Sequence, residues 1–323
     1  MNRTLHLLPS LLLALSGLRA QQATIPVPDN LTVEGIPALP TSMVGEVRSY
    51  TESRGAGLAD WHPLRKEMLI STRFGNSNQL HYVKFAGGDR RQLTFFEDAV
   101  GEAGFEPRQG AYFLFGKDIG GNEFSQIHRF DLATSKVTML TDGRRSQNGG
   151  VQWNHAGDRI AYVSTMRNGK DRDIRVMDPL DPSTDKVVAE NVGGGWGVAG
   201  WSPDDKLLLL TEGLSVNESR IHIVDAVTGV KTRVLPKADE RTTYGAVAFT
   251  ADGKGIYLLS NTDSEFNRLC LYDRTTEKLK TLTADIPWDV TGTELTKDGS
   301  KLAFTTNENG TSRAYILNTA TGT

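Results

Sequence analysis

An apolar strand pattern recurs six times along this chain, and its spacing constrains the fold more than any single motif. The copies follow one another at steps of 45 to 48 residues, and each is flanked by further short apolar strands and turns. The central residues of the six copies are His81, His128, Arg175, His222, Cys270 and Tyr315. A period of roughly 40 to 50 residues with several short strands per unit is typical of a propeller blade. We therefore predict an all-β fold, a β-propeller of four-stranded antiparallel blades, with about six blades present and the last one incomplete.

Each unit begins with a small, glycine-rich strand, which a turn joins to three more strands. Residues 193–201 form the clearest first strand, and residues 202–205 (Ser-Pro-Asp-Asp) form the turn after it. Aspartate favours such turns because it hydrogen-bonds to nearby backbone, and glycine because it accepts positive φ. We expect the glycines to lie where the first strands converge and Cβ atoms would be crowded. The run Gly193-Gly194-Gly195 lacks the lysine and helix of a phosphate-binding loop.

Three segments are predicted along the chain. Residues 1–20 read as a signal peptide, residues 21–45 as an extended arm with four prolines, and residues 46–323 as the propeller. The sixth unit stops before its outermost strand, and an open sheet edge is a liability, so we expect a longer natural protein of which this is the front part. The predicted units are 46–96, 97–143, 144–191, 192–240, 241–285 and 286–323.

The N-terminus indicates export. Arg3 precedes an apolar run from Leu5 to Leu18, and Ala20 offers a cleavage site. This run is too short for a permanent transmembrane helix, so no integral membrane segment is expected after cleavage. The formal net charge is −3, and it becomes −5 once Arg3 and Arg19 are removed. A mildly acidic protein gives no electrostatic reason to expect nucleic acid as a partner. We predict a periplasmic or extracellular protein.

The sequence contains no motif of a catalytic centre. Gly-x-Ser-x-Gly, His-Glu-x-x-His and Cys-x-x-Cys are all absent. His81, His128 and His222 occupy equivalent positions in different units. They should therefore be spread around the propeller as strand residues rather than converge on one ion. No catalytic residue, metal site or cofactor is predicted.

Two groups of residues are candidates for substrate binding. Glu97, Asp98 and Glu102 lie in the connection between the first two units, where carboxylates could bind a peptide amine; the alternative is a solvated acidic loop. Trp196 and Trp288 are placed on first strands, where they would reach the central tunnel. Core packing is the alternative for both tryptophans.

The first unit carries a more specific resemblance. Four stretches of this unit resemble the N-terminal propeller of the prolyl-oligopeptidase-like serine peptidases, the group of dipeptidyl- and acylaminoacyl-peptidases. These stretches are residues 50–63, 68–74, 79–81 and 91–96. Residues 298–308 are similar to late blades of the same propellers. The resemblance covers essentially residues 46–323, although its repeat motifs are shared with TolB-like propellers.

This resemblance implies a propeller that precedes an α/β-hydrolase domain with a Ser-Asp-His triad and restricts entry to short peptides. The present chain has no such domain, so no triad residue is carried over and the chain should be inactive alone. Short peptides are then its expected partners, through the missing C-terminal domain. The paired glutamates that hold the amine in dipeptidyl-peptidases are not recognisable, and Glu97-Asp98 is at best an analogue.

Three hypotheses remain at this point. The first is the gating propeller of an exported serine peptidase. The second is a free-standing TolB-like periplasmic propeller that binds proteins. The third is a tunnel metalloenzyme such as a lactonase or lyase, with Asp60, Asp289 and Glu294 as its only candidate ligands on first strands.

Overall fold

The structure, a computed structural model, describes residues 23–238 and 240–322. The predicted signal peptide, residues 1–20, lies outside the described residues. The chain divides into two compact units, of which the first ends at Gly55 and the second spans Ala56–Thr323. No helix in the described ranges is both long and apolar enough to span a membrane.

The N-terminal unit is a folded-back segment followed by a helix. An antiparallel bridge joins Thr24 to Pro40, and the backbone N–H of Ile25 donates to the carbonyl of Leu39 at 2.8 Å. Helix α1 (Ser42–Thr51) then follows and buries none of its residues. Proline is tolerated just before a helix, and none lies within α1. The helix spans residue 45, the predicted end of the arm, and the bridge brings the ends of the segment before it together.

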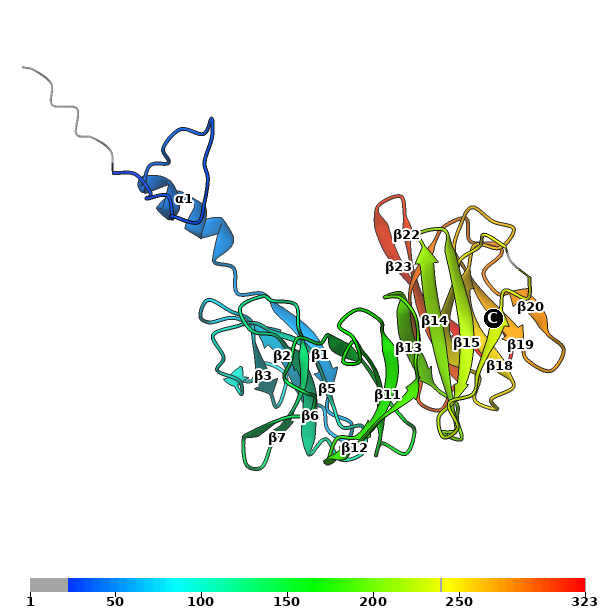
Figure 1. Cartoon of the computed structure of the whole chain (residues 1–323). Coiled ribbons are helices and arrows are strands. Elements are labelled where there is room, and N and C mark those ends of the chain that lie inside the picture. The colour runs from blue at the N-terminus through cyan, green and yellow to red at the C-terminus, as the bar shows by residue number, and fades with distance from the viewer. Residues whose placement is uncertain (1–22, 239, 323) are drawn as a thin grey trace, which may run out of the picture. The chain divides into compact units, whose positions relative to one another are not determined.

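The second unit consists of six antiparallel sheets in which each strand pairs with the next along the chain (Figure 1). The first five sheets have four strands and the sixth has three, which confirms the predicted fold. Blade 1 holds β1 (Ala56–Trp61), β2 (Met68–Thr72), β3 (Gln79–Val83) and β4 (Arg91–Gln92); blade 2 holds β5 (Val100–Phe105), β6 (Tyr112–Lys117), β7 (Gln126–Asp131) and β8 (Lys136–Met139); blade 3 holds β9 (Asn148–Trp153), β10 (Ile160–Ser164), β11 (Asp173–Asp178) and β12 (Asp181–Ala189). Blade 4 holds β13 (Trp196–Trp201), β14 (Leu207–Ser215), β15 (Glu218–Asp225) and β16 (Lys231–Leu235); blade 5 holds β17 (Tyr244–Phe249), β18 (Gly255–Ser260), β19 (Arg268–Asp273) and β20 (Lys278–Thr281); blade 6 holds β21 (Val290–Leu295), β22 (Lys301–Glu308) and β23 (Thr311–Asn318).

The hydrophobic core is divided among the interfaces between successive blades. Leu69 and Leu80 of blade 1, for example, form one buried cluster with Phe105 and Phe113 of blade 2. Full burial of such a side chain stabilises the fold by about 1.5–3 kcal/mol. A blade therefore depends on its neighbours for most of its stability.

Blade 6 is covered on one face. Along β22, Leu302, Phe304 and Thr306 are buried, whereas the residues between them are exposed. Leu302 and Phe304 join Tyr257 and Leu269 of blade 5 in one cluster. The period-2 alternation is that of a strand with one face on the core.

The turn after each first strand repeats one hydrogen-bonding scheme in the last three blades. A serine or threonine hydroxyl donates to the aspartate two residues later, at 2.6 Å in each case. The same hydroxyl accepts the backbone N–H of the residue that begins the next strand. The three hydroxyl residues are Ser202, Thr250 and Thr296. Short polar side chains thus fix the turn that the sequence predicted.

The reason expected for the glycines of the first strands holds only in part. A Cβ on Gly195 would lie 1.9 Å from the carbonyl oxygen of Gly213, so close backbone approach requires glycine there. A Cβ on Gly149, Gly197 or Gly200 would meet no atom within 4 Å. Crowding is therefore wrong as a general explanation, because these first strands leave open space beside them.

Candidate functional site

The turns after the first strands surround one pocket of about 720 Å³, which we call the turn-side pocket. It is lined by blades 2 to 6, and the Nζ of Lys297 in blade 6 lies 3.5 Å from the carbonyl oxygen of Pro107 in blade 2. Trp153, Trp201 and Phe249 contribute the aromatic part of its wall. Segments almost 200 residues apart thus share one hollow, as a propeller brings equivalent turns to one end.

Charged side chains of both signs line the turn-side pocket. Arg108 and Lys297 are exposed, as are Glu294 and Asp298. The hydroxyls of Thr296 and Ser300 and the backbone N–H of Ser300 bond to Asp298 and lower the pKa of its carboxyl to about 2. The Asp298 carboxylate therefore already accepts hydrogen bonds from residues of its own turn.

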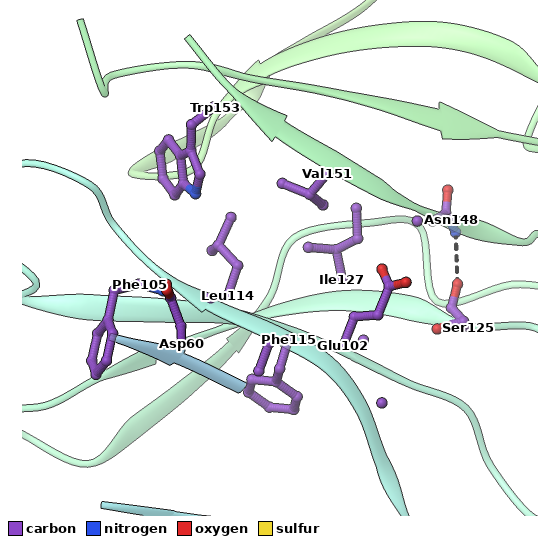
Figure 2. Close-up of a pocket in the computed structure, with 15 residues that line it drawn as sticks. Asp60, Glu102, Phe105, Leu114, Phe115, Ser125, Ile127, Asn148, Val151 and Trp153 are labelled. Carbon is purple, nitrogen blue, oxygen red and sulfur yellow. Dashed lines mark hydrogen bonds between the residues drawn. The ribbon is translucent and has the colours of Figure 1, made fainter. Parts of the chain in front are cut away.

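A second hollow, of about 320 Å³, lies between blades 2 and 3, and we call it the inter-blade cleft (Figure 2). First strands of neighbouring blades contact each other at β1–β5, β9–β13 and β13–β17, whereas blades 2 and 3 meet mainly through β7 and β9. The cleft occupies the space left between β5 and β9. Its walls carry Leu114, Ile127, Val151 and Trp153, with Glu102 at its edge.

The structure separates the three acidic candidates. Glu97 is exposed and lines neither hollow. Asp98 forms an ion pair with Lys117 at 3.2 Å and accepts the backbone N–H of Gly120 at 2.9 Å. These hydrogen bonds, first that of Gly120 and then that of Lys117, hold the pKa of Asp98 below its usual value. Glu102 alone lies at a cavity.

The two tryptophan candidates lie away from both hollows. Trp196 begins β13, is 5% exposed, and donates its indole N–H to the carbonyl of Val192 at 2.9 Å. Its ring contacts His222, and Lys231 lies 4.2 Å from the ring centre. Trp288 is half-buried in the connection before β21 rather than on that strand. Neither residue lines the turn-side pocket or the inter-blade cleft.

The three carboxylates of the metalloenzyme hypothesis do not converge. Asp60 accepts the backbone N–H of Phe105 at 2.8 Å, and Asp289 accepts that of Asn267 at 2.7 Å. Glu294 lines the turn-side pocket. Within the part of the chain that the structure describes, no three His, Cys, Asp or Glu residues are grouped so as to hold a metal ion. His81, His128 and His222 lie on the third strands β3, β7 and β15, as predicted.

Sequence reasoning missed the residues that shape both hollows. Trp153, Gly149 and Ile127 line the inter-blade cleft, and Arg108 and Lys297 line the turn-side pocket. The sequence did contain a signal for the residues of the turn-side pocket, because they occupy equivalent positions in successive units. The sequence contained no such signal for the inter-blade cleft, since the cleft depends on the distance between two blades.

Comparison with known proteins identifies the type of propeller. Residues 99–322 match the family model described as "Prolyl oligopeptidase, N-terminal beta-propeller domain". No curated protein matches the sequence.

Solved structures share the fold at low identity. A structure from a study of two prolyl endopeptidases aligns with a TM-score of 0.64 at 13% identity, covering 83% of this chain and 42% of that one. TolB from Acinetobacter baumannii aligns with a TM-score of 0.53 at 16% identity, covering 87% and 66%. An oligogalacturonate lyase in complex with manganese aligns with a TM-score of 0.63 at 14% identity, covering 83% and 77%. The chain thus spans less than half the length of the prolyl endopeptidase.

Proposed function

Because the chain belongs to the prolyl oligopeptidase N-terminal propeller family, we propose that it is the non-catalytic propeller of an exported serine peptidase. In this proposal the propeller admits short peptides and positions them for hydrolysis by an α/β-hydrolase domain elsewhere in the natural protein. The family match over residues 99–322 is the observation that carries the proposal.

Two features of the chain support a positioning role. The sequence has no Gly-x-Ser-x-Gly, and in this proposal the nucleophile belongs to the α/β-hydrolase domain. The turn-side pocket and the inter-blade cleft both border first strands, and each combines apolar walls with charged side chains. Apolar walls with a few polar groups are the usual lining of a binding site, and in this proposal they contact the peptide. Export rests on the apolar segment after Arg3.

The first experiment is to sequence the DNA downstream of the codon for Thr323. We expect an open frame that completes blade 6 and reaches Gly-x-Ser-x-Gly. The protein from that frame should be labelled by a serine-directed phosphonate, and the present 323-residue chain should not. It should also cleave a given peptide bond faster in a short peptide than in a long polypeptide that contains the same sequence. A stop codon at that point would contradict the peptidase proposal and favour a free-standing, TolB-like binding propeller.

A further inference from the structure

The inter-blade cleft has the walls of a pocket for an aliphatic chain. Leu114 and Ile127 on its blade 2 side are 3% and 2% exposed, and both belong to a buried cluster against which Val151 and Trp153 of blade 3 pack. Figure 2 shows Leu114, Ile127, Val151 and Trp153 around the same opening. An apolar group entering there would leave water without displacing any hydrogen bond of these side chains.

One carboxylate at the cleft is free to take a partner. In the described ranges, the Glu102 carboxylate makes no hydrogen bond or ion pair, and its side chain lines the same cleft as Phe115 and Ile127 (Figure 2). The other carboxylate, that of Asp60, already accepts the backbone N–H groups of Trp61 and Phe105, both at 2.8 Å. Glu102 therefore supplies the uncommitted charge.

The wall also carries the polar side chains of Ser125 and Asn148, and Asn148 is already bonded. Asn148 is 4% exposed, donates from Nδ2 to the carbonyl oxygen of Ser125 at 3.2 Å, and accepts the hydroxyl of Ser164 at 2.6 Å. A ligand would gain little by offering further polar groups to Asn148. The free carboxylate and the apolar walls therefore favour a ligand with one cationic group and an apolar stem.

From this combination we propose that the inter-blade cleft binds the side chain of a lysine or arginine residue of a peptide. The aliphatic stem lies against Ile127 and Val151, and the cationic head reaches Glu102 at the edge of the cleft. Long basic side chains suit such a place because they bury their methylene groups while the charge stays near water. The inference rests on the proposed function only in taking the ligand to be a peptide.

Binding is measured by calorimetry on the 323-residue chain with three short peptides. The first is Ala-Lys-Ala with both ends blocked, the second replaces lysine by norleucine, and the third is the norleucine peptide with a free N-terminus. We expect the blocked lysine peptide to bind at least about threefold more tightly than the blocked norleucine peptide. Raising the salt concentration should weaken binding of the lysine peptide. Tighter binding of the free-amine norleucine peptide than of the lysine peptide would overturn the proposal in favour of terminal-amine recognition.

Two variants with matched controls locate the site. Glu102→Gln should reduce affinity for the lysine peptide by about threefold to tenfold, while Glu97→Gln, at an exposed residue outside the cleft, should leave it unchanged. Gly149→Val should fill the cleft and abolish binding, because its Cβ meets no atom within 4 Å and φ is not left-handed. Gly197→Val is its control, at an equally open first-strand glycine outside the cleft.

Unchanged affinity in both Glu102→Gln and Gly149→Val would refute the site even if the peptide bound elsewhere. Absence of binding to the folded wild-type chain would refute the inference as well. Neither result depends on hydrolysis, so both leave the reading-frame test of the proposed function intact.

Discussion

The carboxylate of Asp205, in the turn of blade 4, accepts the backbone N–H of His155 in the turn of blade 3 at 2.8 Å. It also accepts the N–H of Ala156 at 2.9 Å and the side-chain amide of Asn154 at 3.2 Å. Asp205 itself has φ of 56°, at the turn position where the next two blades carry Gly253 and Gly299 with φ of 69° and 68°. Blade 4 thus keeps a strained aspartate where glycine would be easier, because the carboxylate joins two blades.

Replacing Asp205 by glycine should destabilise the propeller. Glycine removes the left-handed strain, a gain of about 1 kcal/mol or less. It also removes the acceptor of three inter-blade hydrogen bonds, each of which contributes about 0.5–1.5 kcal/mol. We expect a lower Tm for Asp205→Gly, and a smaller decrease for Asp205→Asn, which keeps one oxygen acceptor. A Tm equal to or above that of the wild type in Asp205→Gly would show that the bridge between the turns contributes little.

Gly110 should tolerate alanine less well than other left-handed glycines. Its φ is 62°, and a Cβ there would lie 2.4 Å from Nε2 of the buried His62. Gly169 has φ of 75° but no atom within 4 Å of its Cβ position. Gly169→Ala should therefore cost only the left-handed backbone strain, about 1–2 kcal/mol, and Gly110→Ala distinctly more. The free energy of unfolding of both variants in urea tests this; equal losses would mean that His62 moves aside freely.

A buried ion pair in blade 3 offers a third test. Arg175 contacts Asp185 at 2.7 Å with both side chains at most 15% exposed, and the hydroxyl of Tyr162 donates to the same carboxylate at 2.9 Å. Asp185→Leu leaves the guanidinium and the phenol without their acceptor, and should destabilise by about 3–5 kcal/mol. The double variant Arg175→Met with Asp185→Leu should recover part of that loss. Chemical denaturation of the single and double variants measures the coupling energy between Arg175 and Asp185. Additive losses in the double variant would show that the two side chains are not coupled.

The sequence was sufficient for the blades because their information is local and repeated. Apolar strands at steps of 45 to 48 residues and turn residues such as Asp252-Gly253 specify antiparallel four-stranded units. Helix α1 was missed because ten residues with a weak apolar pattern follow a proline-rich stretch. Its first four residues lie within the predicted arm, residues 21–45.

The candidate site was less predictable for a geometric reason. The position of Glu102 along the chain does not reveal that the cleft opens beside it, since that depends on the separation of β5 from β9. Asp98 lies four residues before Glu102, yet its charge is paired with that of Lys117 at the end of β6. Trp196 satisfied the pattern of a first-strand aromatic, but packing against His222 placed it in the core.

Buried histidines should make the propeller less stable as the pH falls below neutrality. Burial lowers the pKa of His81, whose ring is 0% exposed, and the charge of Arg90 lowers it further, against the hydrogen bond to the carbonyl of Gln79. Burial likewise lowers the pKa of His62, His128 and His222. A histidine with a lowered folded pKa favours folding while it is neutral, because the unfolded chain binds the proton more readily.

The stabilisation is complete above the unfolded pKa, about 6.5, and is lost as the pH falls from there through the lower folded values. We expect Tm to decrease from pH 7 to pH 5, above the range in which carboxylates such as Asp98 titrate. His81→Gln, which can still donate to the Gln79 carbonyl, should show a shallower decrease whatever its Tm at pH 7. The same slope in the variant and the wild type would mean that folded His81 gains its proton as readily as it does in the unfolded chain.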